Sequence, residues 1–136
     1  MVKGPVLFVC VENAGRSQMA EAFARKYGLN AQSASTIPSA GINPIVVQTM
    51  LERGIDISSN HPKTLTPELI RDASLVVTMG CSIEDACPRP MIAQMQKKLI
   101  EWHLEDPKAK PLEDVRRIRD EIEGKIIDLR KTLSTP

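Results

Sequence analysis

Short apolar runs that alternate with longer amphipathic segments constrain the fold of this chain most. VLFVC at 6–10 is apolar without interruption, SLVVTM at 74–79 is nearly so, and LIEWHL spans 99–104. Runs of this kind predict strands that are buried on both faces, as in a parallel sheet. A weaker strand, QSAST, is expected at 32–36.

Helical patterns fill the intervals between these strands. Residues 16–28 repeat apolar side chains every four positions and stop at a glycine, and residues 43–54 open with an Asn-Pro pair. A short helix begins at Thr66-Pro67, and residues 112–133 form a long one. The long helix carries an apolar stripe at alternating steps of three and four, made of Val115, Ile118, Ile122, Ile126, Leu129 and Leu133. This alternation predicts an α/β fold with a parallel sheet covered by helices on both faces.

The bulk composition indicates one soluble domain and excludes several classes of partner. A length of 136 residues suits a single domain, which we place at 1–133 with a frayed tail at 134–136. The net charge is +1, from 18 basic and 17 acidic residues, and aromatic residues make up 3%. These values argue against a nucleic-acid or membrane partner. No apolar stretch could span a bilayer and the N-terminus lacks a signal-peptide pattern, so we expect a cytoplasmic protein, and we take it to be a monomer.

The cysteine and histidine counts argue against structural disulfides and metal sites. The three cysteines are Cys10, Cys81 and Cys87, and an odd number in a cytoplasmic chain does not suggest a disulfide framework. The two histidines, His61 and His103, are not near a cysteine in sequence, so no zinc pattern is visible. We therefore expect no metal and no cofactor, which leaves redox or nucleophilic chemistry for the thiols.

Three reactive side chains follow predicted strands directly. Cys10 ends the first strand, Cys81 follows the strand at 74–79, and Asp106 follows the strand at 99–104. Ligands of parallel sheets bind beyond the carboxyl ends of the strands. The sequence therefore predicts that these groups converge on one edge of the sheet.

The segment CVENAGRS at 10–17 joins the first strand to the first helix and has the composition of an anion-binding loop. Its backbone N–H groups can point inward as a nest, Gly15 allows a sharp bend, and the following helix adds partial positive charge. Arg16 can clamp two oxygens of a tetrahedral oxyanion, and the Ser17 hydroxyl can donate to sulfur. These groups favour the thiolate of Cys10. The oxyanion-binding residues predicted here are Val11, Glu12, Asn13, Ala14, Gly15, Arg16 and Ser17.

Two side chains of this loop need separate expectations. Glu12 would place a negative charge beside an oxyanion, so we expect its side chain to point outward and only its N–H to be used. Asn13 is expected to brace the loop through side-chain hydrogen bonds. The simpler alternative is a buried cysteine that closes a strand and a solvated arginine that begins a helix. The placement of the loop between strand and helix favours the functional interpretation.

The stretch CVENAGRSQMAEAFA resembles the phosphate-binding loop and first helix shared by low-molecular-weight protein tyrosine phosphatases and thioredoxin-coupled arsenate reductases. Further blocks that look like this family are SAG at 39–41, GIDIS at 54–58, VVTMGC at 76–81 and WHLEDP at 102–107. The resemblance extends over nearly the whole chain. It implies a flavodoxin-like three-layer sandwich with a four-stranded parallel sheet.

Two features separate the branches of this family. The phosphatases usually carry aromatic residues after the Asp-Pro pair, to stack on a phosphotyrosine ring, whereas here Lys108 and Ala109 take these positions. Cys81 and Cys87 resemble the cysteine pair of the reductases, for which a phosphatase has no need. Both features favour the reductase branch. In either branch the resemblance implies that Asp106 is the general acid that protonates the leaving oxygen.

The resemblance also implies a disulfide relay that is fed by thioredoxin or a similar dithiol protein. Cys10 attacks the arsenic of arsenate, Cys81 then attacks Cys10, and arsenite leaves while a Cys10–Cys81 disulfide forms. Cys87 attacks Cys81 and frees Cys10, and thioredoxin reduces the resulting Cys81–Cys87 disulfide. Phosphate and sulfate are expected to mimic arsenate. Two alternatives stay open: a phosphatase that hydrolyses phosphate monoesters, and a non-enzymatic module that senses oxyanions or redox state.

Some family members bind potassium near the loop through an asparagine and acidic residues. Asn13 and Glu21 match part of that set, but the segment 64–66 offers no aspartate, so we expect no cation site here.

Overall fold

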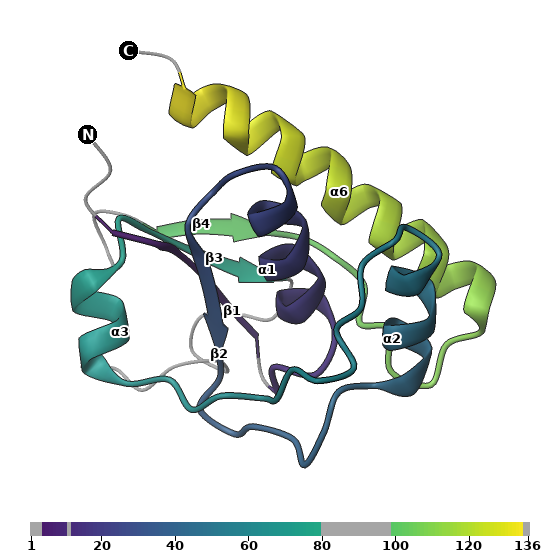
Figure 1. The fold of residues 1–136 in the computed structure, drawn as a ribbon. Helices are drawn as coiled ribbons and strands as arrows, with labels where there is room; N and C mark the ends of the chain where they lie inside the picture. Colours follow the sequence, from purple (N-terminus) through teal and green to yellow (C-terminus); the bar gives the residue numbers. More distant parts are fainter. Residues whose placement is uncertain (1–3, 11, 80–98, 135–136) are drawn as a thin grey trace.

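The four strands form one parallel sheet. The computed structural model describes residues 4–10, 12–79 and 99–134. Within them lie β1 (Val6–Val9), β2 (Ala31–Ala34), β3 (Leu75–Met79) and β4 (Leu99–Trp102), in the spatial order β2-β1-β3-β4. All three neighbouring pairs are parallel, so the carboxyl ends of the strands share one edge (Figure 1).

Helices cover both faces of this sheet and make three layers. The described helices are α1 (Arg16–Lys26), α2 (Pro44–Leu51), α3 (Pro67–Asp72) and α6 (Leu112–Ser134). Figure 1 shows α1 and α6 together on one side and α3 on the other. Side chains of α1, α2 and α6 share one buried cluster, whereas Ile70 of α3 belongs to a second. The expected three-layer α/β sandwich with a four-stranded parallel sheet is confirmed.

The central strand β1 shows why the sequence specifies this arrangement. Val6 and Phe8 point into the cluster under α1 and α6, while Leu7 and Val9 point into the cluster under α3. Side chains alternate between the faces of a strand, so a strand with helices on both sides must be apolar at every position. Each of these four residues is at most 3% exposed.

The expected helix boundaries agree with the local signals. Asn43 accepts a hydrogen bond from the Ile45 N–H at the start of α2, and Thr66 accepts one from the Leu69 N–H at the start of α3. Gly28, just after α1, has a φ of 89°, which favours glycine at a helix end.

Three strands end earlier than the sequence indicates, and β1 stops at Val9, one residue before Cys10. β2 stops at Ala34 because Ser35 leaves β1 and forms an isolated parallel bridge with Thr64. β4 stops at Trp102, and Leu104, two residues further along the chain, is buried in the cluster that α1, α2 and α6 share. In the stripe of α6, five of the six expected side chains are buried, but Leu133 is 47% exposed because it lies in the final turn.

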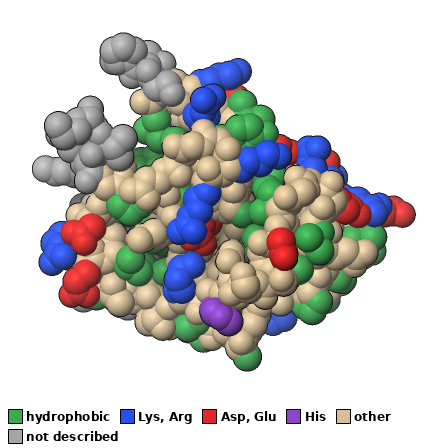
Figure 2. All heavy atoms as spheres, in the orientation of Figure 1, with side chains coloured by type: hydrophobic (Ala, Val, Ile, Leu, Met, Phe, Trp, Pro, Cys, Tyr) green, Lys and Arg blue, Asp and Glu red, His purple; other side chains and the backbone are tan. Residues whose placement is uncertain are grey.

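The surface carries charges of both signs. Basic and acidic side chains are interspersed over the face shown in Figure 2, in keeping with the net charge of +1. Among the described residues, no helix has both the length and the apolar character needed to cross a bilayer.

Candidate active site

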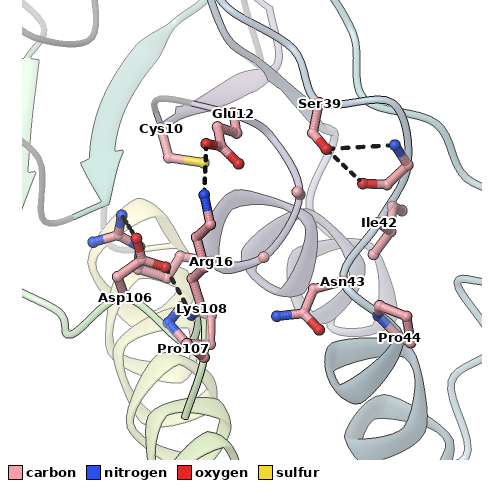
Figure 3. Close-up of a pocket in the computed structure, with 14 residues that line it drawn as sticks. Cys10, Glu12, Arg16, Ser39, Ile42, Asn43, Pro44, Asp106, Pro107 and Lys108 are labelled. Carbon is pink, nitrogen blue, oxygen red and sulfur yellow. Dashed lines mark hydrogen bonds and ion pairs between the residues drawn. The ribbon is translucent and has the colours of Figure 1, made fainter.

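A cavity of about 630 Å³ opens at the carboxyl ends of β1 and β4 (Figure 3). Cys10 comes directly after β1, and Asp106 lies in the segment that follows β4. Both line the cavity, as does Arg16 from the first turn of α1. The structure thus brings together three of the predicted catalytic residues. Cys81 and Cys87 lie outside the described residues.

Hydrogen bonds define the surroundings of the Cys10 sulfur. Sγ lies 2.9 Å from the Ser17 hydroxyl oxygen, and Asn13 Nδ2 donates to that same oxygen at 2.7 Å. Because Ser17 Oγ accepts from Asn13, its single proton remains free, and either the hydroxyl or the thiol can be the donor in the contact with sulfur. A hydroxyl that donates to sulfur stabilises the thiolate, which is the nucleophilic form.

Asn13 is the brace of the loop, as expected. Its side chain is fully buried, and its backbone has a φ of 55°, a left-handed conformation that asparagine tolerates. Asn13 Oδ1 accepts from the Lys63 N–H at 2.8 Å and from Gln18 Nε2 at 3.1 Å. These contacts orient the amide so that Nδ2 faces Ser17. The Lys63 contact was missed by sequence reasoning, since it joins residues fifty positions apart.

The backbone carbonyl groups of the anion-binding loop accept hydrogen bonds from surrounding residues. The Ser39 N–H donates to the Glu12 carbonyl at 2.9 Å, and the Asn43 N–H donates to the Ala14 carbonyl at 3.0 Å. The Asn13 carbonyl accepts from Gln18 Nε2 at 3.2 Å. Carbonyls held in this way are directed out of the loop, and this arrangement suits a nest of inward N–H groups. Val11, the remaining predicted loop residue, lies outside the described residues.

Residues 103–109, which follow β4 and are called the acid loop below, hold Arg16 in place. Its Nη1 donates to the Leu104 carbonyl at 3.0 Å, and Nη2 lies 3.9 Å from Asp106 Oδ2. The residue is only 8% exposed. A buried guanidinium with a fixed plane costs little further entropy when it binds an oxyanion.

A tight turn presents Asp106 to the cavity. The Lys108 N–H donates to Asp106 Oδ1 at 3.0 Å, and Ala109 has a φ of 60°. The Asp106 side chain is 60% exposed, so water can reach it.

Gly15 matters for the space that a side chain would take, in line with the expectation from the sequence. Its φ of −140° lies outside the left-handed region. A Cβ at this position would lie 2.9 Å from Cγ of Pro107. The missing side chain therefore lets the acid loop pack directly on the anion-binding loop.

Glu12 differs from the expectation that its side chain points away from the site. Its carboxylate reaches over the cavity, where Oε2 lies 3.4 Å from Nζ of Lys108 (Figure 3). Lys108 was noted in the sequence only as a non-aromatic residue. Ser39 and Asn43 also line the cavity; the SAG block and the helix cap were the sequence signals near them.

The buried carboxylate of Glu21 already has cationic partners. Lys63 Nζ lies 3.2 Å from Oε1 and Arg25 Nη2 lies 2.9 Å from Oε2, while the Ser33 hydroxyl donates to Oε1 at 2.6 Å. Across residues 4–10, 12–79 and 99–134, no group of three or more His, Cys, Asp or Glu side chains could hold a metal ion.

The arrangement can support nucleophilic attack on a tetrahedral oxyanion. The Cys10 sulfur provides the nucleophile, Arg16 and the loop provide positive charge for the oxygens, and Asp106 provides a proton for a leaving oxygen.

Comparisons with known proteins place this site in a family. Residues 5–136 match the family described as low molecular weight phosphotyrosine protein phosphatase. An arsenate reductase of Staphylococcus aureus strain Newman is 35% identical over 125 residues, which cover 90% of this chain and 92% of the relative.

Solved structures of both reductases and phosphatases are similar. An arsenate reductase in a phosphate-binding state is 30% identical with a TM-score of 0.83, covering 96% of this chain and 99% of the other. A thioredoxin-dependent arsenate reductase of Corynebacterium glutamicum is 36% identical with a TM-score of 0.75, covering 98% of this chain and 64% of the other. A low molecular weight protein tyrosine phosphatase from T. tengcongensis is 30% identical with a TM-score of 0.79, covering 95% and 99%.

Proposed function

Since the chain belongs to the low molecular weight phosphotyrosine protein phosphatase family, we propose that its cavity binds arsenate and that the protein reduces arsenate to arsenite. The observation that carries the proposal is the placement of Cys10, Arg16 and Asp106 around one cavity, in a chain that has two further cysteines. Relatives named arsenate reductase, which match over most of their length, support the same activity.

The first step uses the described residues. Cys10 Sγ attacks arsenic while Arg16 and the loop hold the oxygens, and Asp106 protonates the departing oxygen, which leaves as water. The Ser17 hydroxyl, 2.9 Å from Sγ, is placed to donate a hydrogen bond to the attacking sulfur. The product is a covalent thiol–arsenate adduct on Cys10.

The second step requires the other two cysteines, for which the sequence is the support. Cys81 attacks Cys10 Sγ, the S–As bond breaks, and its electron pair stays on arsenic, so arsenite leaves and a Cys10–Cys81 disulfide forms. Cys87 then attacks Cys81 and restores the Cys10 thiolate. Arsenate gains two electrons, and two thiols lose them. Thioredoxin, which one structural relative is named as depending on, returns the electrons by reducing the Cys81–Cys87 disulfide.

The relay fits a cytoplasmic monomer. Thiols stay reduced in that compartment, and all three cysteines belong to one chain.

The test is arsenate-dependent NADPH consumption with thioredoxin and thioredoxin reductase supplied. We expect turnover by the native protein and its loss in Cys81→Ser and in Cys87→Ser. Both variants should retain any hydrolysis of a small aryl phosphate, because that reaction needs Cys10 alone. If arsenate drives no NADPH oxidation, the reductase proposal is wrong.

A phosphatase is the second candidate, and one observation favours it. The cavity is open and far larger than a single tetrahedral oxyanion, so it has room for the leaving group of an ester. Against it, the positions after Asp106-Pro107 are Lys108 and Ala109, which give no ring to stack on an aryl group. Efficient ester hydrolysis without arsenate turnover would select this candidate.

A further inference from the structure

An acidic side chain in an anion-binding loop needs an explanation. The loop residue Glu12 lines the cavity with Cys10, and so does the acidic Asp106. Among the described lining residues, the cationic side chains are Arg16 and Lys108. The two acidic side chains are therefore matched by two cationic ones, which leaves no excess of positive charge to attract an oxyanion. A dianion in such a cavity would be repelled unless the carboxylate of Glu12 were neutralised.

Lys108 is placed to neutralise Glu12. Its Nζ lies 3.4 Å from Glu12 Oε2, which joins the acid loop to the anion-binding loop across ninety-six positions of sequence. Figure 3 shows the lysine side chain extending from the turn after Asp106 towards the Glu12 carboxylate. The backbone of Lys108 is fixed by its own N–H, which donates to Asp106 Oδ1, and by the left-handed conformation of Ala109.

The ion pair between Lys108 and Glu12 is exposed, so we expect it to affect anion binding and to contribute little to the stability of the fold. The Lys108 and Glu12 side chains are 70% and 43% exposed. Exposed ion pairs add little to folding, and a hydrated ammonium can change partners readily. An ammonium at the mouth of the cavity can therefore turn towards an incoming anion without a cost to the fold.

We propose that Lys108 is a specificity-determining residue for doubly charged oxyanions. In the empty cavity its ammonium pairs with Glu12, and in the occupied cavity it lies between the Glu12 carboxylate and the anion. Glu12 opposes anions in general, and Lys108 offsets that opposition most for a dianion, because Coulomb attraction scales with charge. The inference rests on the proposed function only in taking the cavity as an oxyanion site.

Calorimetric titration with inorganic phosphate, above neutral pH where the dianion dominates, tests the pair. We expect Lys108→Met to weaken binding about two- to fivefold, the range for exposed charges. Glu12→Gln should tighten it by a similar factor. The double variant should return to within about twofold of the native protein, because it removes both charges together. Lys108→Arg should bind as the native protein does.

A matched control and a second pair of anions sharpen the test. Lys110→Met removes a lysine of the same turn that pairs with Glu105 and does not line the cavity, so phosphate binding should not change. Lys108→Met should weaken binding of sulfate, a tetrahedral dianion, more than binding of perchlorate, a tetrahedral monoanion.

The proposal is overturned if Lys108→Met binds phosphate as the native protein does, or if the double variant binds phosphate as weakly as Lys108→Met. It is also overturned if Lys108→Met loses as much affinity for perchlorate as for sulfate. Phosphate binding involves no redox step. A native protein that binds phosphate but does not turn over arsenate would thus contradict the proposed function and leave this inference standing.

Discussion

At the scale of single residues, the chemistry depends on a short chain of hydrogen bonds that ends on sulfur. Lys63 N–H holds Asn13, Asn13 holds Ser17, and Ser17 faces Cys10. Each of these hydrogen bonds fixes the orientation of the next side chain in the series. The loop therefore does not rely on an arriving oxyanion to orient the nucleophile.

Removal of the Ser17 hydroxyl should slow every reaction of the Cys10 thiolate. Hydrogen bonds to charged groups contribute about 1.5–3 kcal/mol, so Ser17→Ala should lower arsenate turnover and alkylation of Cys10 by iodoacetamide by about tenfold or more. Ser35→Ala is the control, since the Ser35 hydroxyl is also buried but has no partner among the described residues. Equal rates for Ser17→Ala and the native protein would contradict the role given to this hydroxyl.

Gly15 should be intolerant of even one added carbon. In Gly15→Ala the new Cβ would lie 2.9 Å from Pro107 Cγ, so the acid loop must move. Displacement of a reacting group by about 1 Å can cost about a hundredfold in rate, and we expect arsenate turnover to fall by at least tenfold. Gly41 lines the same cavity, but a Cβ there would meet none of the described atoms within 4 Å, so Gly41→Ala should keep its activity. Steady-state rates of arsenate turnover for the two variants test this, and equal rates would contradict it.

At the scale of the elements, the apolar stripe of α6 predicts which side chains are buried at all but one position. The spacing of its apolar residues predicted the helix and the five side chains that are buried in the core. Leu133 belongs to the same stripe and is exposed, because the helix runs past the layer that it covers. A periodic pattern gives the face of a helix, but it does not give the point at which its partner ends.

This difference predicts unequal effects of truncation along α6. Ile122→Ala should lower the free energy of unfolding by about 2–5 kcal/mol, because Ile122 is fully buried and its loss leaves a cavity. Leu133→Ala should change it by about 0.5 kcal/mol or less. Urea denaturation of both variants measures the difference. Similar losses would mean that the end of α6 is covered in solution.

At the scale of the whole molecule, the α2–α6 contact carries charges that link stability to acidity. Arg116 donates to both carboxylate oxygens of Glu52, from Nε and from Nη2, and Arg119 Nη1 lies 2.8 Å from Glu52 Oε1. The hydrogen bonds from Arg116 hold the pKa of the Glu52 carboxyl below its usual range, and Arg119 contributes in the same direction.

The sign of the pH dependence follows from this lowered pKa. The ordinary pKa of glutamate is about 4.3, so Glu52 stabilises the fold above that pH and loses its contribution as the pH falls through the lower folded value. In Glu52→Gln the free energy of unfolding should therefore fall less steeply with acidification below about pH 4.3. Denaturant melts of both proteins across this range provide the measurement, and identical slopes would contradict it.

The sequence predicted local features well and contacts between distant segments poorly. The strand at β1, the caps of α2 and α3, and the loop from Cys10 to Ser17 follow from neighbouring residues. The contacts of Lys63 with Asn13 and of Lys108 with Glu12 join segments that only the sheet order brings together. The orientation of Glu12 was wrong for the same reason, since its counter-ion lies in another loop.

The most direct test of the central proposal is a count of thiols after a single encounter with arsenate. Fully reduced protein, without thioredoxin, would be mixed with arsenate, quenched by alkylation and analysed by mass spectrometry after proteolysis. We expect two of the three thiols to disappear, a disulfide that joins Cys81 to Cys87, and one arsenite released for each molecule of protein. Three alkylated cysteines and unchanged arsenate would contradict arsenate reduction by this chain.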